Sequence, residues 1–257
     1  LCALGLAWQA AGRTAPVDFL HYWIVPRVLQ RVEVDNIYSD SGRRVLGEQA
    51  RRLAEAATAG DRQKVATRGT LRIDDGKVDT VATPFLFWVF GAAGSRDFER
   101  DFRVFDALSL LAYAAAVVYA ARVLGFGWSQ ALLWLTVFTI CYEPFMADIR
   151  VGNVNRLQLA WLAAALAAFG RGRAAWRWAL GGGLLGLGVM FKPNLAVVLL
   201  PLLAAILVQR AWRPLAALAG GGLAGAAAGL ALPATLFGGL GCWKQWAGIL
   251  SQIVASR

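Results

Sequence analysis

Six apolar runs, separated by short polar connections, occupy most of the second half of the chain. Each is long enough, or nearly so, for a helix that crosses a membrane. We expect these spans over 104–123, 128–142, 155–169, 176–191, 193–208 and 215–237. The pattern therefore predicts an all-α, multi-span membrane protein with a transmembrane helix bundle over 104–237.

The connections between these runs alternate in charge. Every second connection carries the arginines Arg122, then Arg171, Arg173 and Arg177, then Arg210 and Arg213, whereas the others carry one basic residue each, Arg150 and Lys192. Because cytoplasmic connections are enriched in Lys and Arg, the arginine-rich ones are expected inside. The connections that carry Arg150 and Lys192 then lie on the extracytoplasmic side.

The region 12–83 is more polar and is expected to form an extracytoplasmic loop with amphipathic helices. Phe19, Tyr22 and Trp23 share one helical face, which predicts a helix lying along the membrane surface. Pro26 is expected to bend or interrupt this helix.

Four other segments complete the expected organisation. A second amphipathic helix is predicted over 43–57, and a loop or short hairpin with an Asp-Gly turn over 61–79. The apolar segment 84–94 is too short to cross a membrane, so it is expected to be re-entrant or interfacial. The scattered apolar residues of 238–257 indicate another interfacial segment.

Composition supports a membrane protein. Hydrophobic residues make up 58% of the 257 residues, charged residues only 16%, and the mean hydropathy is +0.52. We expect one membrane domain over 1–257, which is a fragment of a longer protein because it starts at Leu1 without Met. The net charge of +10 does not indicate a nucleic-acid partner, since the basic residues are dispersed between apolar runs. Membrane lipids are the expected partners of these charges.

Three polar points fall on the predicted outer side: Asp18, the island 148–155 and Lys192. The island reads Asp-Ile-Arg-Val-Gly-Asn-Val-Asn and lies between two apolar runs. Lys192 separates two apolar helices, where a lysine is costly unless it extends to the interface or meets an anion. We expect the fold to bring the three points together.

Asp18 admits two interpretations. A partly desolvated carboxylate at the membrane face can have a pKa high enough to act as a general base. An Asp directly before Phe19 is also an ordinary N-cap of the following helix. His21 lies three residues further on, where it would either tune this carboxylate or pack at the interface.

The island offers hydrogen-bond donors but no nucleophile. Arg150, Asn153 and Asn155 suit a phosphate or hydroxyl ligand, or they form a turn and a helix cap around Gly152. Asp148 is a candidate base or the ion-pair partner of Arg150. A metal site is not expected, because one His and three isolated cysteines give no ligand spacing.

Several blocks of the chain resemble glycosyltransferase family 87, mannosyltransferases of the GT-C type that use polyprenyl-phosphate donors. The blocks are Asp18-Phe19 with Tyr22 and then Ile37-Tyr38; Thr83-Pro84-Phe85; Gly152-Asn153-Val154-Asn155; and 183–193, which ends in Phe-Lys-Pro. The chain departs from the family pattern where Asn153 replaces the usual Gln, and where the turn at 38–40 lacks a Pro.

The resemblance implies a GT-C-like bundle and a reaction. Asp18 would deprotonate an acceptor hydroxyl, which attacks the anomeric carbon of a sugar, expected to be mannose, on a polyprenyl phosphate, with inversion. The donor phosphate would be held by Arg150, Asn153 and Lys192. Supporting contacts are expected from His21, Tyr22, Asp148 and Asn155. The acceptor would be a glycolipid or glycan on the extracytoplasmic face of the cell membrane, and no cofactor besides the donor substrate is implied.

Two other classes of protein stay open. A transporter or flippase for a lipid-linked or anionic substrate would need polar residues at mid-membrane and interrupted helices. A structural or sensor membrane protein would need no chemistry at the polar points. The interiors of the later spans are nearly free of charge and the polar points lie at helix ends, so the sequence favours the enzyme.

Overall fold

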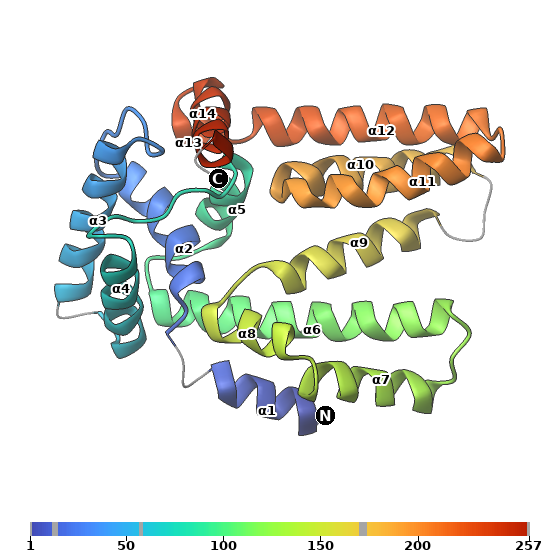
Figure 1. Cartoon of the computed structure of the whole chain (residues 1–257), viewed down its shortest axis with the longest axis horizontal. Helices are drawn as coiled ribbons and strands as arrows, with labels where there is room; N and C mark the ends of the chain where they lie inside the picture. Colours follow the sequence, from blue (N-terminus) through green and yellow to red (C-terminus); the bar gives the residue numbers. More distant parts are fainter. Residues whose placement is uncertain (1, 12–14, 57–58, 170–173, 256–257) are drawn as a thin grey trace.

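Every regular element that the structure describes is a helix (Figure 1). The computed structural model describes residues 2–11, 15–56, 59–169 and 174–255. The helices are α1 (Cys2–Ala11), α2 (Val17–Leu29), α3 (Asp40–Glu55), α4 (Asp61–Ile73), α5 (Pro84–Ala93), α6 (Phe98–Val123), α7 (Trp128–Ile140), α8 (Glu143–Val151), α9 (Asn155–Phe169), α10 (Ala175–Phe191), the 3-10 helix η1 (Pro193–Leu195), α11 (Ala196–Val208), α12 (Trp212–Ala231), α13 (Ala234–Phe237) and α14 (Gly241–Ala255). The predicted all-helical class is confirmed.

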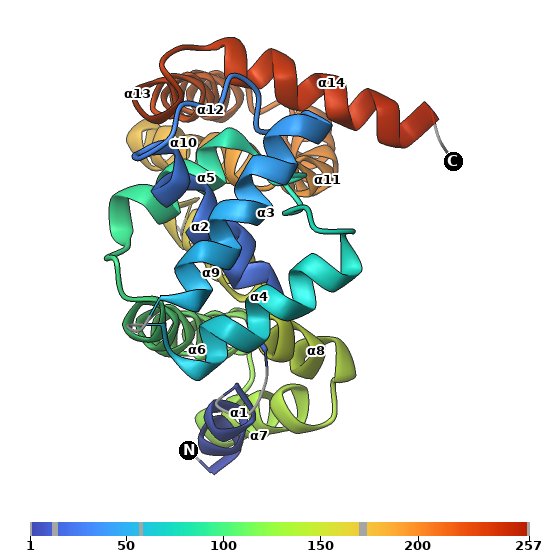
Figure 2. The ribbon, with the colours of Figure 1, turned by 90° about the vertical axis from the view of Figure 1, so that its left-hand side faces the viewer.

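The helices form a bundle and a cap. The long helices α6, α7, α9, α10, α11 and α12 pack against one another and extend along the horizontal direction of Figure 1. The helices α2 to α5 and α14 gather at one end of this bundle, on the left of Figure 1. Figure 2 looks onto that end, with α2 at its centre. We call this group of helices the outer cap.

Fewer helices than expected are long enough to cross a membrane alone. Among the described residues, Phe98–Val123 and Trp212–Phe237 have the required length and apolar character, and α7 with α8 adds a third if this pair, bent by 63°, is one span. Helix α9 has 15 residues, a length of about 22 Å, which is short of a hydrocarbon core of about 30 Å. The predicted spans thus exist as helices, but several are short. The connection with Arg171 and Arg173 lies outside the described residues.

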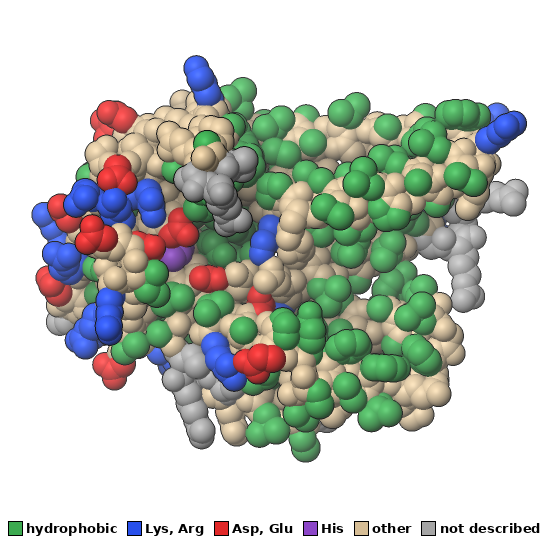
Figure 3. Space-filling view, in the orientation of Figure 1, with side chains coloured by type: hydrophobic (Ala, Val, Ile, Leu, Met, Phe, Trp, Pro, Cys, Tyr) green, Lys and Arg blue, Asp and Glu red, His purple; other side chains and the backbone are tan. Residues whose placement is uncertain are grey.

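The bundle and the cap expose different kinds of side chains. Figure 3 shows hydrophobic side chains spread over the bundle, whereas charged side chains concentrate on the outer cap. Large side chains that are more than half exposed on the bundle include Leu111, Leu133, Val197, Leu200 and Leu223. An apolar belt of this kind suits the lipid environment of a membrane protein.

Helices α10 and α12 touch through their backbones. A Cβ on Gly182 would overlap the Leu218 carbonyl oxygen, and a Cβ on Gly186 would overlap that of Gly222. Gly225 lies on α12, and a Cβ there would overlap the α10 backbone. The glycine-rich stretches of both helices are therefore packing surfaces, as small residues are in membrane bundles.

Helix α2 is not the surface helix that its sequence predicts. Phe19, Leu20, Ile24 and Val25 are 1% exposed or less, because α3, α4 and α5 all pack against α2. Apolar residues around most of its circumference explain this position, since such a helix is stable only when it is buried. Pro26 does not interrupt the helix.

The hairpin predicted within 61–79 is wrong. The segment forms α4 and then a turn at Asp75 and Gly76, whose φ angles are 50° and 77°. Side chains at helical spacing are buried on its inner face: Gln63, Ala66, Thr67 and Thr70. This helical period outweighs the short alternation that suggested strands. The Asp-Gly turn is present, but it follows a helix.

The other cap segments follow the sequence more closely. The predicted helix over 43–57 is α3, and it starts earlier because Ser39 Oγ accepts the Gly42 N–H at 3.0 Å. Residue 57 lies outside the described residues. Segment 84–94 forms α5, whose N-cap is Thr83. Most of the predicted interfacial segment 238–257 forms α14.

Candidate active site

Gly152 brings the polar island against α2. It follows α8 in the left-handed conformation, with φ of 71°, which glycine adopts without steric cost. A Cβ here would lie 2.9 Å from Phe19 Cβ and 3.0 Å from Pro16 Cβ, which is too close for carbon atoms. The glycine therefore lets the backbone of the island approach the start of α2, beside Asp18.

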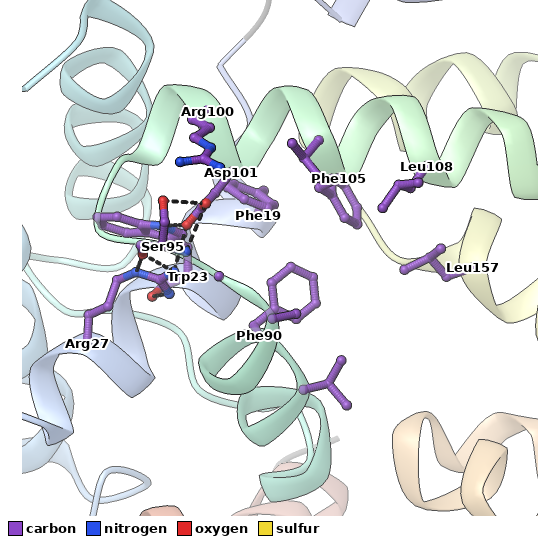
Figure 4. Close-up of a pocket in the computed structure, with 14 residues that line it drawn as sticks. Phe19, Trp23, Arg27, Phe90, Ser95, Arg100, Asp101, Phe105, Leu108 and Leu157 are labelled. Atoms are coloured by element: carbon purple, nitrogen blue, oxygen red, sulfur yellow. Dashed lines mark hydrogen bonds and ion pairs between the residues drawn. The ribbon is translucent and has the colours of Figure 1, made fainter.

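Further along the chain, α2 is also anchored to α6. Arg27 forms an ion pair with Asp101 at 2.7 Å, and Trp23 Nε1 donates to the same carboxylate at 2.9 Å (Figure 4). Arg27 Nε also donates to the Ser95 carbonyl oxygen at 2.7 Å. These groups and Phe19 line a cavity of about 380 Å³. Because α2 is held at both points, the position of Asp18 is fixed.

Asp18, Asn153 and Lys192 form a chain of contacts. Asn153 Nδ2 donates to Asp18 Oδ2 at 2.6 Å, and Lys192 Nζ donates to Asn153 Oδ1 at 3.3 Å. Lys192 also donates to Asn155 Oδ1. One amide thus bridges a carboxylate and an ammonium group. The structure brings together the three polar points that the sequence singled out.

Lys192 projects from a break between α10 and η1. Its backbone is extended, with φ of −148°, and Pro193 begins η1. Thr83 Oγ donates to the Phe191 carbonyl oxygen at 3.1 Å and accepts the Leu86 N–H at 3.1 Å. The residue that caps α5 therefore also fixes the end of α10, immediately before Lys192.

A pocket of about 460 Å³ lies at this chain of contacts, within the size range of small-molecule sites. Helix α2, the segment before α5, the island, the α10–η1 break and α14 all contribute to its wall. The polar and aromatic lining residues are Asp18, His21, Tyr22, Asp79, Thr83, Asn153, Phe191, Lys192, Asn194 and Trp246.

Burial shifts the pKa values of both Asp18 and Lys192. It raises the pKa of the Asp18 carboxyl above 3.8, against the opposing effect of the Asn153 hydrogen bond; Asp148 raises this pKa further and Lys192 lowers it. Burial lowers the pKa of the Lys192 amine below 10.5, and Asp148 and Asp18 oppose this shift. Asp18 is therefore a stronger proton acceptor than an exposed aspartate.

His21 and Tyr22 line the pocket in uncharged forms. Burial lowers the pKa of His21 to about 4, and its Nε2 lies 3.2 Å from Thr70 Oγ. Of the two roles expected for His21, tuning Asp18 or packing, the structure shows a partly buried side chain in contact with Thr70 of α4. Burial raises the pKa of the Tyr22 hydroxyl, and its ring packs on Phe90 with centroids 5.3 Å apart.

Comparison with known protein families matches residues 82–256 to the model of glycosyltransferase family 87, which is more than half of the chain. The chain belongs to glycosyltransferase family 87. It is thus a membrane glycosyltransferase. No curated protein and no solved structure matches it. Asn153 and Lys192 lie within the matched region of this family 87 protein, whereas Asp18 precedes it.

The side chain of Arg150 lies away from the pocket. It forms an ion pair with Glu143 at 2.8 Å, and the two side chains are 50% and 70% exposed. Asp148 is not the partner of Arg150, because residues two apart on a helix do not face each other. Asn155 is the first residue of α9 and bonds Lys192.

The sequence analysis missed a buried ionic network beneath the family 87 pocket. Arg156 Nη1 lies 2.6 Å from Asp106 Oδ1, and Arg156 Nε lies 3.4 Å from Asp148 Oδ2. All three side chains are 5% exposed or less. Asp106 and Arg156 each fall inside an apolar run, and isolated charges there were the available signal. The network joins α6, α8 and α9 and lies near the pocket, since Asp148 acts on the pKa of both Asp18 and Lys192.

Metal ligands do not cluster in the described part of this protein. No group of three His, Cys, Asp or Glu side chains there is placed to hold a metal ion. Cys2, Cys141 and Cys242 are free thiols.

Proposed function

We propose that this protein transfers mannose from a polyprenyl-phosphate donor to a hydroxyl group of a glycolipid or glycan, on the extracytoplasmic face of the cell membrane. The observation that carries the proposal is the contact chain Asp18–Asn153–Lys192. It places a basic carboxylate and a cation a few ångströms apart in one pocket. Transfer from a phosphate donor needs a proton acceptor and a group that stabilises the departing phosphate.

Each residue then has a definite role. Asp18 accepts the proton of the acceptor hydroxyl as its oxygen bonds to the anomeric carbon. The bond between that carbon and the phosphate oxygen breaks, and its electron pair leaves with the polyprenyl phosphate. Lys192 and Asn153 stabilise the negative charge that develops on this leaving group. Attack opposite the leaving group inverts the anomeric centre.

Asn153 would couple the two halves of the reaction. Its Nδ2 holds Asp18 and its Oδ1 holds Lys192, so it keeps base and cation apart while fixing both. A direct ion pair would lower the basicity of Asp18 and occupy Lys192. Because Arg150 is paired with Glu143, we assign the phosphate contact to Lys192 and Asn153 rather than to Arg150.

The experiment measures transfer of labelled mannose from polyprenyl-phosphate-mannose in membranes that contain the protein. Asp18→Asn should abolish transfer while the protein inserts and purifies normally. Asp75→Asn is the matched control, because Asp75 is an exposed carboxylate at a turn of the same cap. Full activity of Asp18→Asn would remove the base assignment.

A transporter is the second candidate, and the bent pair α7–α8 is the observation that favours it. The charged side chains near this bend pair with one another, Arg156 with both Asp106 and Asp148, and all three are 5% exposed or less, so they offer no exposed charge to a substrate. Liposomes that contain the protein separate the two candidates. Movement of a lipid-linked sugar across the bilayer without any new glycosidic bond would support transport and contradict the transferase.

A further inference from the structure

The pocket around Asp18 is divided by charge. Lys192 and the island amides form one wall, and Asp79, His21 and Trp246 contribute to another. The negative charge of Asp79 acts on both Asp18 and His21, so it is close to the reacting groups. Among the described residues, no Lys or Arg forms an ion pair with Asp79. Arg43 also acts on His21, but its effect is smaller than that of Asp79, so the negative charge of Asp79 outweighs it on this wall.

The two walls suit different ligands. The wall with Lys192 attracts a phosphate, whereas Asp79 repels one. His21, with a pKa of about 4, is neutral at pH 7 and offers no positive charge to an anion. A carboxylate and a neutral imidazole do accept hydrogen bonds from hydroxyl groups. The Asp79 wall therefore suits an uncharged ligand with several hydroxyls.

Trp246 gives the same wall an apolar surface. Its Nε1 donates to the Val81 carbonyl oxygen at 3.0 Å, while the Val81 N–H donates to Asp79 Oδ1 at 3.1 Å. One short segment thus holds both the indole and the carboxylate. An aromatic ring beside hydrogen-bond acceptors can contact the C–H groups of a polyol while its hydroxyls bond to the acceptors.

We infer that Asp79, His21 and Trp246 form the acceptor half of the pocket. This half selects a neutral polyol, such as a sugar unit without phosphate or carboxylate. The inference rests on the proposed function, which places the donor phosphate at Lys192. Asp79 determines specificity in two ways: it accepts a hydroxyl hydrogen bond, and its charge disfavours an anionic acceptor beside Asp18.

The test compares two acceptors with the full chain in nanodiscs and polyprenyl-phosphate-mannose as donor. The probes are methyl mannoside and its C6 carboxylate, which differ in one charged group. Asp79→Leu should raise KM for methyl mannoside about tenfold, the size expected for loss of one charge-assisted hydrogen bond, without changing KM for the donor. Asp79→Asn removes the charge but keeps an Oδ1 acceptor for the Val81 N–H. It should lower the preference for methyl mannoside over its C6 carboxylate about tenfold. Asp75→Asn, on an exposed carboxylate, should change neither value.

Donor hydrolysis without acceptor separates the two proposals. Water then supplies the oxygen that bonds to the anomeric carbon, its proton goes to Asp18, and polyprenyl phosphate leaves. Asp79→Leu and Trp246→Leu should still hydrolyse the donor, because Asp18, Asn153 and Lys192 are present in both. In Asp79→Leu the acidic limb of hydrolysis should move to lower pH, because Asp79 raises the pKa of Asp18. An unchanged acceptor KM in Asp79→Leu, or a changed donor KM, would overturn the acceptor assignment and leave the proposed function standing. If the wild type neither transfers nor hydrolyses the donor, the proposed function fails and this inference fails with it.

Discussion

Two arginines of this protein form ion pairs of similar length in opposite environments. Arg156 lies 2.6 Å from Asp106, with side-chain exposures of 1% and 3%. Arg150 lies 2.8 Å from Glu143, with exposures of 50% and 70%. Replacing each arginine by Met keeps much of the side-chain volume and removes the charge. The pair of variants therefore isolates the effect of burial.

The expected losses of unfolding free energy differ several-fold. Arg156→Met leaves two carboxylates, Asp106 and Asp148, buried without their counter-charge, which costs about 3–5 kcal/mol. Arg150→Met breaks an exposed pair, which costs about 0–1 kcal/mol. Each kcal/mol corresponds to roughly 2–4 °C in Tm for a domain approaching this size. The Arg156 variant should therefore melt at least several degrees below the Arg150 variant.

Thermal unfolding followed by tryptophan fluorescence measures the difference, since the chain carries 11 Trp residues. A third variant, Arg156→Met with Asp106→Asn and Asp148→Asn, removes the stranded charges and should recover part of the loss. Equal melting temperatures for the two single variants would refute the argument from burial. Failure of the triple variant to recover any stability would assign the loss to packing of Arg156 on Phe105, whose ring centroid lies 5.6 Å from the guanidinium.

Three further predictions concern packing and pH. Gly221→Ala should weaken the α10–α12 contact and lower Tm, because the new Cβ would overlap the Ala179 backbone. Gly220→Ala should leave Tm unchanged, because a Cβ there meets open space. Equal changes in Tm for the two variants would contradict the backbone contact. Wild-type stability should fall from pH 6.5 towards pH 4 by on the order of 3 kcal/mol through His21, because only the unfolded state binds its proton in that window. His21→Gln should lack this part of the slope in urea unfolding, and an unchanged slope would disprove the assignment. Asn153→Ala removes a hydrogen bond that lowers the pKa of Asp18, so the acidic limb of the transfer profile should move to higher pH. An unmoved limb would exclude Asp18 as the base, whereas a shift to lower pH would indicate a direct ion pair between Asp18 and Lys192.

Much of the site could be predicted because its residues mark the ends of apolar runs. Counting helix ends places Asp18, the island 148–155 and Lys192 on one side without any knowledge of packing. The contacts among these residues depend on two features that the hydrophobic periodicity of the sequence does not reveal. One is the close approach at Gly152, and the other is the Thr83 hydrogen bond to the end of α10.

The sequence-based expectations that the structure does not bear out share a physical cause. Local patterns describe which faces of a segment are apolar, but they do not show which elements cover it. Helix α2 was placed on the surface because its aromatic face was clear, while the covering by α3, α4 and α5 is a long-range property. One of the two roles expected for Asp148, an ion pair with Arg150, rested on their closeness in sequence, although the helix turns the two side chains apart and Arg156 of α9 lies near Asp148 instead.

The contact between Asp18 and Asn153 also sets an order of events during biosynthesis. The two residues are 135 positions apart, and Lys192 follows 39 positions after Asn153. At the usual elongation rates of about 5–20 residues per second, roughly 7–27 s pass between synthesis of the carboxylate and of its amide partner. Helices α2 to α5 can therefore gather well before Lys192 is available to them. A nascent chain halted before α10 would display Asp18, His21 and Asp79, and would lack both Lys192 and Trp246 of α14.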